Sequence, residues 1–129
     1  MLAETMTVIR PAPMVVLLDD DAALRRALTF SLEIEGYRVK SSATGEDLMR
    51  QVLPEDRACL VLDYRLSGMS GLDVLQVLRD RAVALPAILI TSNPTPEVRA
   101  RAARLQAQVV EKPLLGDLLL GHIHQMLPL

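Results

Sequence analysis

Acidic side chains stand directly after apolar runs at two separate places in this sequence. Asp19 and Asp20 follow an apolar run at residues 14–18, and Asp63 follows a second run at residues 59–62. Carboxylates gathered at one place repel one another unless a positive charge joins them. Mg²⁺ takes oxygen ligands and keeps part of its coordination shell for water or a phosphate. Two carboxylates suit such an ion, and a third can then act as a nucleophile, as in enzymes that form an aspartyl phosphate.

A hydroxyl and an ammonium group stand at the ends of two later apolar segments. Thr91 follows residues 87–90, and Lys112 stands at the end of a short segment around residues 108–110. Transfer of a phosphoryl group requires that the charge on its equatorial oxygens be neutralised. Lys112 can supply positive charge and Thr91 a hydrogen bond. Together with the carboxylates and Mg²⁺, these groups predict an aspartate that takes up phosphate.

These five residues meet only if the segments that they follow lie side by side. Strand and helix patterns alternate five times along the chain, which predicts an α/β fold with a parallel sheet covered on both sides. In such a sheet, ligands bind beyond the carboxyl ends of the strands. The predicted strands cover residues 14–18, 37–41, 59–62, 87–90 and 108–110, and the predicted helices cover residues 22–35, 44–53, 72–81, a segment that begins at Pro96, and residues 114–127.

Composition and charge narrow the class of protein. The chain has 129 residues, half of them hydrophobic, which suits one domain with one core. A net charge of −2 produces no large field to attract nucleic acid or an anionic membrane, so neither partner is expected. The single cysteine, Cys59, forms no internal disulfide, and the apolar run at residues 14–18 is too short to span a bilayer. We therefore expect a cytoplasmic protein.

The predicted domain organisation is simple. Residues 1–13 contain two prolines, Pro11 and Pro13, and are expected to form a flexible tail. Residues 14–127 are expected to form a single domain, and we expect no output domain after it. Whether the chain stands alone or is cut from a larger regulator stays open at this stage.

Four motifs in register make the sequence resemble the receiver domain of two-component response regulators. They are VLLDDD at residues 16–21, VLDYRLSGMSG at residues 61–71, ILITS at residues 88–92 and EKP at residues 111–113. The resemblance covers nearly all of residues 14–127. It implies a flavodoxin-like, doubly wound fold of five strands and five helices, with the strands in the order 2-1-3-4-5.

The resemblance also implies a role for each site residue. By motif position, Asp63 is the phosphoacceptor and binds Mg²⁺ together with Asp20. Asp19 binds the metal directly or through water, and the backbone carbonyl of Arg65 completes the protein ligands. Thr91 is the hydroxyl that responds to the phosphate. Lys112 pairs with the phosphate, and the bond from Lys112 to Pro113 is expected to be cis, which proline tolerates.

What the resemblance implies for function is signal transduction through protein contacts. A sensor histidine kinase or a histidine phosphotransfer protein donates the phosphoryl group, and an unknown downstream protein reads the result. Such a domain catalyses its own phosphorylation and slow dephosphorylation at Asp63, with no independent substrate turnover. It is expected to be a monomer or a weak dimer.

Several positions depart from the usual receiver pattern. Ser67 stands where proline is common, Leu114 where Phe is common, and Val109 where many receivers have a Tyr or Phe that swings inward on activation. Val109, together with Pro94 and Pro96 in the loop that normally moves with the threonine, leaves open an alternative: a receiver fold used as a phosphorylation-independent interaction module. A phosphatase of the haloacid dehalogenase type is a weaker one, because that class has a second Asp where this chain has Arg65.

Overall fold

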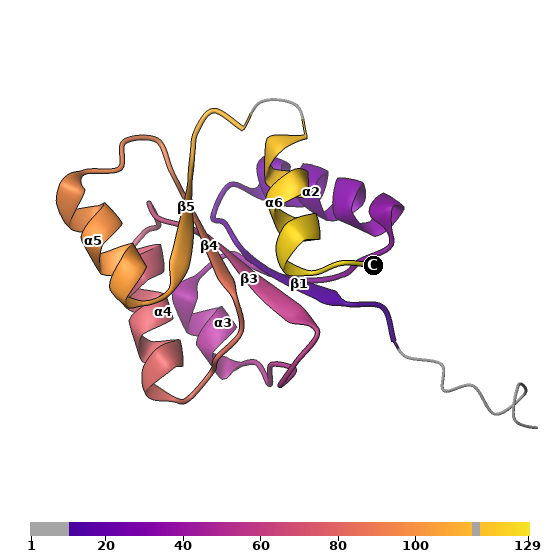
Figure 1. Cartoon of the computed structure of the whole chain (residues 1–129), viewed down its shortest axis with the longest axis horizontal. Helices are drawn as coiled ribbons and strands as arrows, with labels where there is room; N and C mark the ends of the chain where they lie inside the picture. The colour runs from indigo at the N-terminus through magenta and orange to yellow at the C-terminus, as the bar shows by residue number, and fades with distance from the viewer. Residues whose placement is uncertain (1–10, 115–116) are drawn as a thin grey trace, which may run out of the picture.

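The computed structural model of the chain describes residues 11–114 and 117–129. Within them, five parallel strands form one sheet in the order β2-β1-β3-β4-β5 (Figure 1). The strands are β1 (Met14–Leu18), β2 (Arg38–Ser42), β3 (Ala58–Asp63), β4 (Ala87–Thr91) and β5 (Ala107–Glu111). This order confirms the predicted flavodoxin-like α/β fold.

Helices cover both faces of the sheet. They are α2 (Ala22–Glu35), α3 (Gly45–Arg50), α4 (Gly71–Asp80), α5 (Pro96–Arg104) and α6 (Leu118–Met126). Helices α2 and α6 lie over one face, and α3, α4 and α5 lie over the other (Figure 1). Helix α5 begins at Pro96, as predicted, and Thr95 caps it by accepting a hydrogen bond from the amide of Val98.

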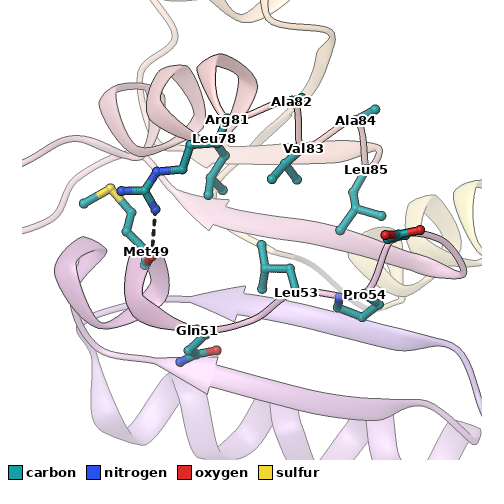
Figure 2. Close-up of a pocket in the computed structure, with 11 residues that line it drawn as sticks. Met49, Gln51, Leu53, Pro54, Leu78, Arg81, Ala82, Val83, Ala84 and Leu85 are labelled. Atoms are coloured by element: carbon teal, nitrogen blue, oxygen red, sulfur yellow. Dashed lines mark hydrogen bonds between the residues drawn. The ribbon is translucent and has the colours of Figure 1, made fainter.

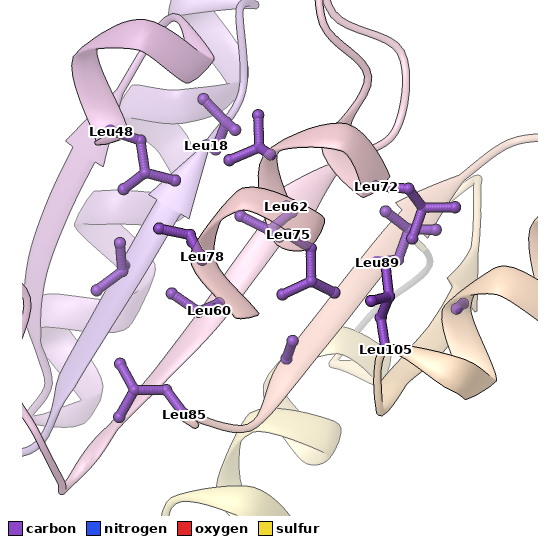
Figure 3. Close-up of a cluster of buried hydrophobic side chains, with 14 of the residues drawn as sticks. Leu18, Leu48, Leu60, Leu62, Leu72, Leu75, Leu78, Leu85, Leu89 and Leu105 are labelled. Atoms are coloured by element: carbon purple, nitrogen blue, oxygen red, sulfur yellow. The ribbon is translucent and has the colours of Figure 1, made fainter. Parts of the chain in front are cut away.

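Two buried clusters, one on each face, hold the sheet between the helices. Alternate residues of β3 enter opposite clusters. Leu60 and Leu62 pack toward α3, α4 and α5 (Figure 3), whereas Cys59 and Val61 pack toward α2 and α6. Burying one such aliphatic side chain contributes roughly 1.5–3 kcal/mol. Every residue of β3 is buried. Asp63 therefore ends a strand that is buried along its whole length.

Several predicted boundaries were wrong by one residue or more, and the structure gives the reason for some of them. Helix α3 ends at Arg50, not at residue 53, because Gln51 is extended with ψ 149° and its side-chain amide bonds Ser42. The last helix begins at Leu118, not at residue 114, and residues 115–116 lie outside the described residues. The second strand begins one residue late, since the amide of Tyr37 bonds back to the carbonyl of Leu32 and closes α2.

The end of α4 has no glycine, although its backbone adopts the conformation that favours one. Ala82 has φ 64°, and its amide bonds the carbonyl of Arg79, while the amide of Val83 bonds the carbonyl of Leu78. These two bonds satisfy carbonyls that a helix end leaves without partners. Because alanine is a strong helix former, the sequence carried no signal for this stop.

The amino-terminal edge of the sheet lies opposite the predicted site. Here the carbonyl of Pro11 accepts a hydrogen bond from Arg57, and that of Ala12 accepts one from Arg38, so residues 11–13 are attached to the sheet. The rest of the predicted tail, residues 1–10, lies outside the described residues.

A hollow of about 480 Å³ lies between the segment after α3 and the end of α4 (Figure 2). Its lining, which includes Leu53 and Arg81, contains none of the predicted site residues.

Candidate functional site

The carboxyl ends of four neighbouring strands bring the predicted residues to one edge of the sheet. Asp19 follows β1, and Asp63 ends β3, whose Leu62 pairs with Leu18. Thr91 ends β4 beside β3. The amide of Lys112 bonds the carbonyl of Thr91 at 2.9 Å, which places Lys112 next along the edge. The predicted convergence of these side chains at this edge is therefore observed.

Three carboxylates form the acidic part of the site. One oxygen from each of Asp19, Asp20 and Asp63 lies within 4.8 Å of the others. Asp19 and Asp63 are buried, at 2% and 5% exposure, whereas Asp20 is exposed. Asp21 is not part of this group, because its carboxylate caps α2 by accepting hydrogen bonds from two amides of the first turn. Within the loop after β1, Asp19 and Asp20 are thus candidate metal ligands, and Asp21 is the cap of α2.

Hydrogen bonds to the side chain and to the backbone carbonyl of Asp19 hold this residue in place. One of its carboxylate oxygens accepts a hydrogen bond from the amide of Asp21 at 2.9 Å. Its carbonyl accepts one from the guanidinium of Arg25 at 2.7 Å, across the first turn of α2. Since both ends of the residue are tethered, the carboxylate of Asp19 is held toward the strand edge.

Lys112 supplies the positive charge nearest to the carboxylates. Its Nζ lies 3.0 Å from Oδ1 of Asp63. Among the described residues, that buried oxygen nevertheless accepts no well-aligned hydrogen bond. The contact is thus a close ion pair whose alignment is incomplete, and Oδ1 keeps the capacity to bind another group. Such an atom is costly to bury without a partner.

The net effect of these neighbours is to favour the protonated form of Asp63. Burial raises the pKa of this carboxyl above its usual value, Lys112 opposes that effect, and the charges of Asp19 and Asp20 add to it. A divalent cation among the three carboxylates would reverse this balance. The orphaned Oδ1 and a donor set made only of oxygens fit a hard cation such as Mg²⁺.

Arg65 lies in the loop directly after β3, and its side chain is exposed. The role expected of it depends on its backbone carbonyl, not on that side chain, and stays a prediction. The bond from Lys112 to Pro113 is cis, as the resemblance implied.

Gly71 is a residue of the site that the sequence analysis did not single out. Its amide bonds the carbonyl of Tyr64 at 3.0 Å and closes the loop after Asp63. A Cβ atom at this position would lie 2.3 Å from the carbonyl oxygen of Asp63 and 3.3 Å from the side chain of Leu89. Only glycine allows α4 to begin so close to the phosphoacceptor candidate. The glycine in the motif at residues 61–71 was the available signal.

Val109 occupies the position where an aromatic side chain was the family expectation. It lies on β5, paired with Leu89 of β4, and packs partly buried against the cluster under α3, α4 and α5. Thr91 is 3% exposed at the end of the neighbouring strand. A β-branched aliphatic side chain with few rotamers therefore lies where an aromatic ring would have to swing.

Comparison with known proteins agrees with this fold. Residues 15–124 match the family model of the response regulator receiver domain. The transcriptional regulatory protein FixJ of Azorhizobium caulinodans is 34% identical over 97 residues, which cover 74% of this chain and 46% of that protein. The chain spans about half the length of this curated relative.

Solved structures give the same result. The non-phosphorylated HemR receiver domain of Leptospira biflexa superimposes with a TM-score of 0.83 at 26% identity, over 91% of this chain and 95% of that one. TrrA of Thermotoga maritima, solved in complex with Mg²⁺ and BeF, matches with a TM-score of 0.74 over 89% of this chain and 99% of that one. At 24% identity, TrrA supports the fold alone.

A parallel five-stranded sheet with an acidic cluster at its carboxyl edge defines a class of signalling domain. This chain belongs to the response regulator receiver domain family, which acts in two-component signalling together with histidine kinases. Across residues 11–114 and 117–129, no helix has the length and apolar character needed to cross a bilayer.

Proposed function

We propose that the protein accepts a phosphoryl group on Asp63 in a Mg²⁺-dependent reaction and signals through protein contacts. The donor is a phosphohistidine on a sensor histidine kinase or a histidine phosphotransfer protein. The observation that carries the proposal is the position of Asp63, which lies 3.0 Å from the ammonium of Lys112 and within 4.8 Å of two other carboxylates. These neighbours supply the metal ligands and the positive charge that a carboxylate needs in order to accept a phosphoryl group.

The chemistry follows from these groups. An oxygen of Asp63 forms a bond to phosphorus while the bond from phosphorus to the histidine nitrogen breaks. The other ring nitrogen takes up a proton, so the histidine leaves as a neutral imidazole. Lys112 neutralises charge on the transferred group, and the hydroxyl of Thr91 donates a hydrogen bond to one of its oxygens. Mg²⁺, when bound by Asp19, Asp20, Asp63 and the carbonyl of Arg65, supplies further neutralisation. Water later attacks the acyl phosphate, which releases inorganic phosphate and restores the carboxylate.

We assign this function to a receiver unit made of residues 14–127. Its own catalysis extends to phosphorylation and slow dephosphorylation at Asp63, without turnover of a separate substrate. The surface formed by α5, β5 and α6 is the proposed contact for the downstream protein. A cytoplasmic location fits the single buried thiol of Cys59, which suits a reducing compartment.

Labelling with a small phosphodonor tests the proposal. Purified protein is incubated with acetyl phosphate and Mg²⁺, and intact-mass analysis detects the added phosphoryl group. We expect labelling of wild type, none of Asp63→Asn, and unchanged labelling of Asp80→Asn, which alters an exposed acid at the far end of α4. Equal labelling of Asp63→Asn would refute the assignment of Asp63, and a lack of dependence on Mg²⁺ would refute the metal requirement.

Val109 favours one alternative, a receiver fold that binds partners without a phosphorylation switch. In that case the phosphoryl group would leave the output surface unaltered. Amide NMR spectra before and after phosphorylation distinguish the two functions. Changes at Thr91 and along α5 support a switch, whereas changes confined to the loops around Asp63 support the interaction module.

A further inference from the structure

The first turn of α4 is closed by a reciprocal pair of hydrogen bonds. The amide of Asp73 donates to the hydroxyl of Ser70 at 3.1 Å, and the amide of Ser70 donates to Oδ2 of Asp73 at 3.2 Å. This capping box satisfies two amides that a helix start leaves without partners. One oxygen of the Asp73 carboxylate is therefore committed to holding the start of its own helix.

The other oxygen of Asp73 reaches a different helix. Nη1 of Arg101, on α5, donates to Oδ1 of Asp73 at 2.9 Å. Both side chains are partly buried, at 34% and 46% exposure. The hydrogen bond from Arg101 is the main reason that the pKa of Asp73 lies below its usual value, with Ser70 contributing next. A single carboxylate thus joins α5 to the cap of α4.

The same first turn lies against the peptide of Asp63. The Cα of Gly71 approaches so closely that a Cβ would lie 2.3 Å from the carbonyl oxygen of Asp63. Protein interiors are packed densely enough to transmit such a displacement to the neighbouring group. Any shift of Gly71 toward β3 must therefore move Asp63. A continuous series of contacts runs from Arg101 through the capping box to the proposed phosphoacceptor.

We propose that Arg101 and Asp73 are positioning residues for the reaction at Asp63, acting through the cap of α4 and Gly71. This inference rests on the proposed phosphorylation of Asp63. Helix α5 belongs to the proposed output surface, so the ion pair also joins that surface to the site. Coupling between two sites is reciprocal in free energy. The contact that positions Asp63 is thus a route from phosphate to α5 that needs no aromatic ring at Val109.

Arg101→Gln removes the ion pair, and Arg99→Gln is its matched control. Arg99 lies on the same helix but pairs with Glu111 of β5, at 3.7 Å. The first readout uses neither metal nor phosphodonor. In amide NMR spectra we expect the signals of Gly71 and Tyr64 to shift in Arg101→Gln and to stay in place in Arg99→Gln.

The second readout is the rate of labelling by acetyl phosphate over a range of Mg²⁺ concentrations. A partly exposed ion pair is a modest interaction, so we expect the rate of Arg101→Gln to fall by about two- to fivefold. Arg101→Lys should recover part of the loss, because an ammonium keeps the charge and loses the planar geometry. If the two residues act through each other, Asp73→Asn combined with Arg101→Gln should lower the rate no further than Asp73→Asn alone.

Urea titrations separate positioning from a loss of stability. If Arg101→Gln lowers the urea midpoint while the Gly71 amide signal and the labelling rate match those of Arg99→Gln, the pair is only structural and the inference fails. If wild type takes up no phosphoryl group at all, the proposed function fails instead. The amide signals of Gly71 and Tyr64 then still decide whether Arg101 positions the peptide of Asp63.

Discussion

The charge of Asp63 should destabilise the fold that presents it. We predict that Asp63→Asn raises the free energy of unfolding at neutral pH in the absence of Mg²⁺. Asparagine keeps the shape of the side chain and removes the charge from a site that is 5% exposed. Lys112, which pairs with that charge, loses little free energy in the variant, because its side chain is 30% exposed and can regain water.

The size of the effect follows from the distances in the site. At an effective dielectric constant of about 20, charges 4.8 Å apart repel by ~3.5 kcal/mol and charges 3.0 Å apart attract by ~5.5 kcal/mol. Exposure of Asp20 weakens its repulsion toward the ~1 kcal/mol of bulk water. The repulsion from Asp19 and Asp20 thus nearly offsets the attraction of Lys112, and lost hydration decides the sign. We expect a gain of about 1–2 kcal/mol for Asp63→Asn.

The effect should depend on pH in a defined direction. Burial is the largest cause of the raised pKa of Asp63. Above the usual value of 3.8, the folded protein therefore holds a proton that the unfolded chain has lost, and stability falls as pH rises through that window. The advantage of Asp63→Asn should be small below pH 3.8 and reach its full size once Asp63 is ionised in the folded state.

Urea unfolding followed by circular dichroism, between pH 4 and 8 and with or without Mg²⁺, measures these quantities. Mg²⁺ should raise the midpoint of wild type and raise that of Asp63→Asn less, because a ligand stabilises the form that binds it. Asp80→Asn serves as the control for removing an exposed acid. A lower midpoint for Asp63→Asn, or an advantage of equal size at every pH, would show that the electrostatic reasoning is wrong.

Three further predictions concern packing and backbone. Gly71→Ala should lower both the urea midpoint and the labelling rate, because a Cβ 2.3 Å from the carbonyl of Asp63 forces a shift of about 1 Å. A misplacement of that size can lower the rate about 100-fold. Unaltered labelling would contradict the contact. Ala82→Gly should raise the free energy of unfolding by about 0.5–1 kcal/mol, because the backbone of Ala82 has φ 64°. A lower urea midpoint would contradict the left-handed conformation. Tyr37→Phe should lower the free energy of unfolding by about 1–2 kcal/mol, because the buried hydroxyl donates to the carbonyl of Leu127 at 2.7 Å and bonds His124 at 2.8 Å. An unchanged urea midpoint would rule out these bonds.

Most of the site could be predicted because its residues follow strand signals that are local. An apolar run such as residues 59–62 must be buried on both faces, and the residue after it must stand at the carboxyl edge of a parallel sheet. That reasoning alone brought Asp19, Asp63 and Lys112 to one place. It did not extend to the end of α4, because Ala82 adopts a left-handed conformation that its own residue type disfavours.

The sequence by itself determined the alternation of strands and helices, the strand-end chemistry and the likeness to a receiver, since each depends on residue type and spacing. Only the tertiary structure decided how Gly71 meets Asp63 and how Arg101 reaches Asp73, because residues far apart in the chain make those contacts only after α4 and α5 pack on the sheet. It also decided the sign of the pKa shift at Asp63, where burial, one ammonium and two carboxylates act at once. Such a balance depends on distances and on lost hydration, which residue types alone do not specify.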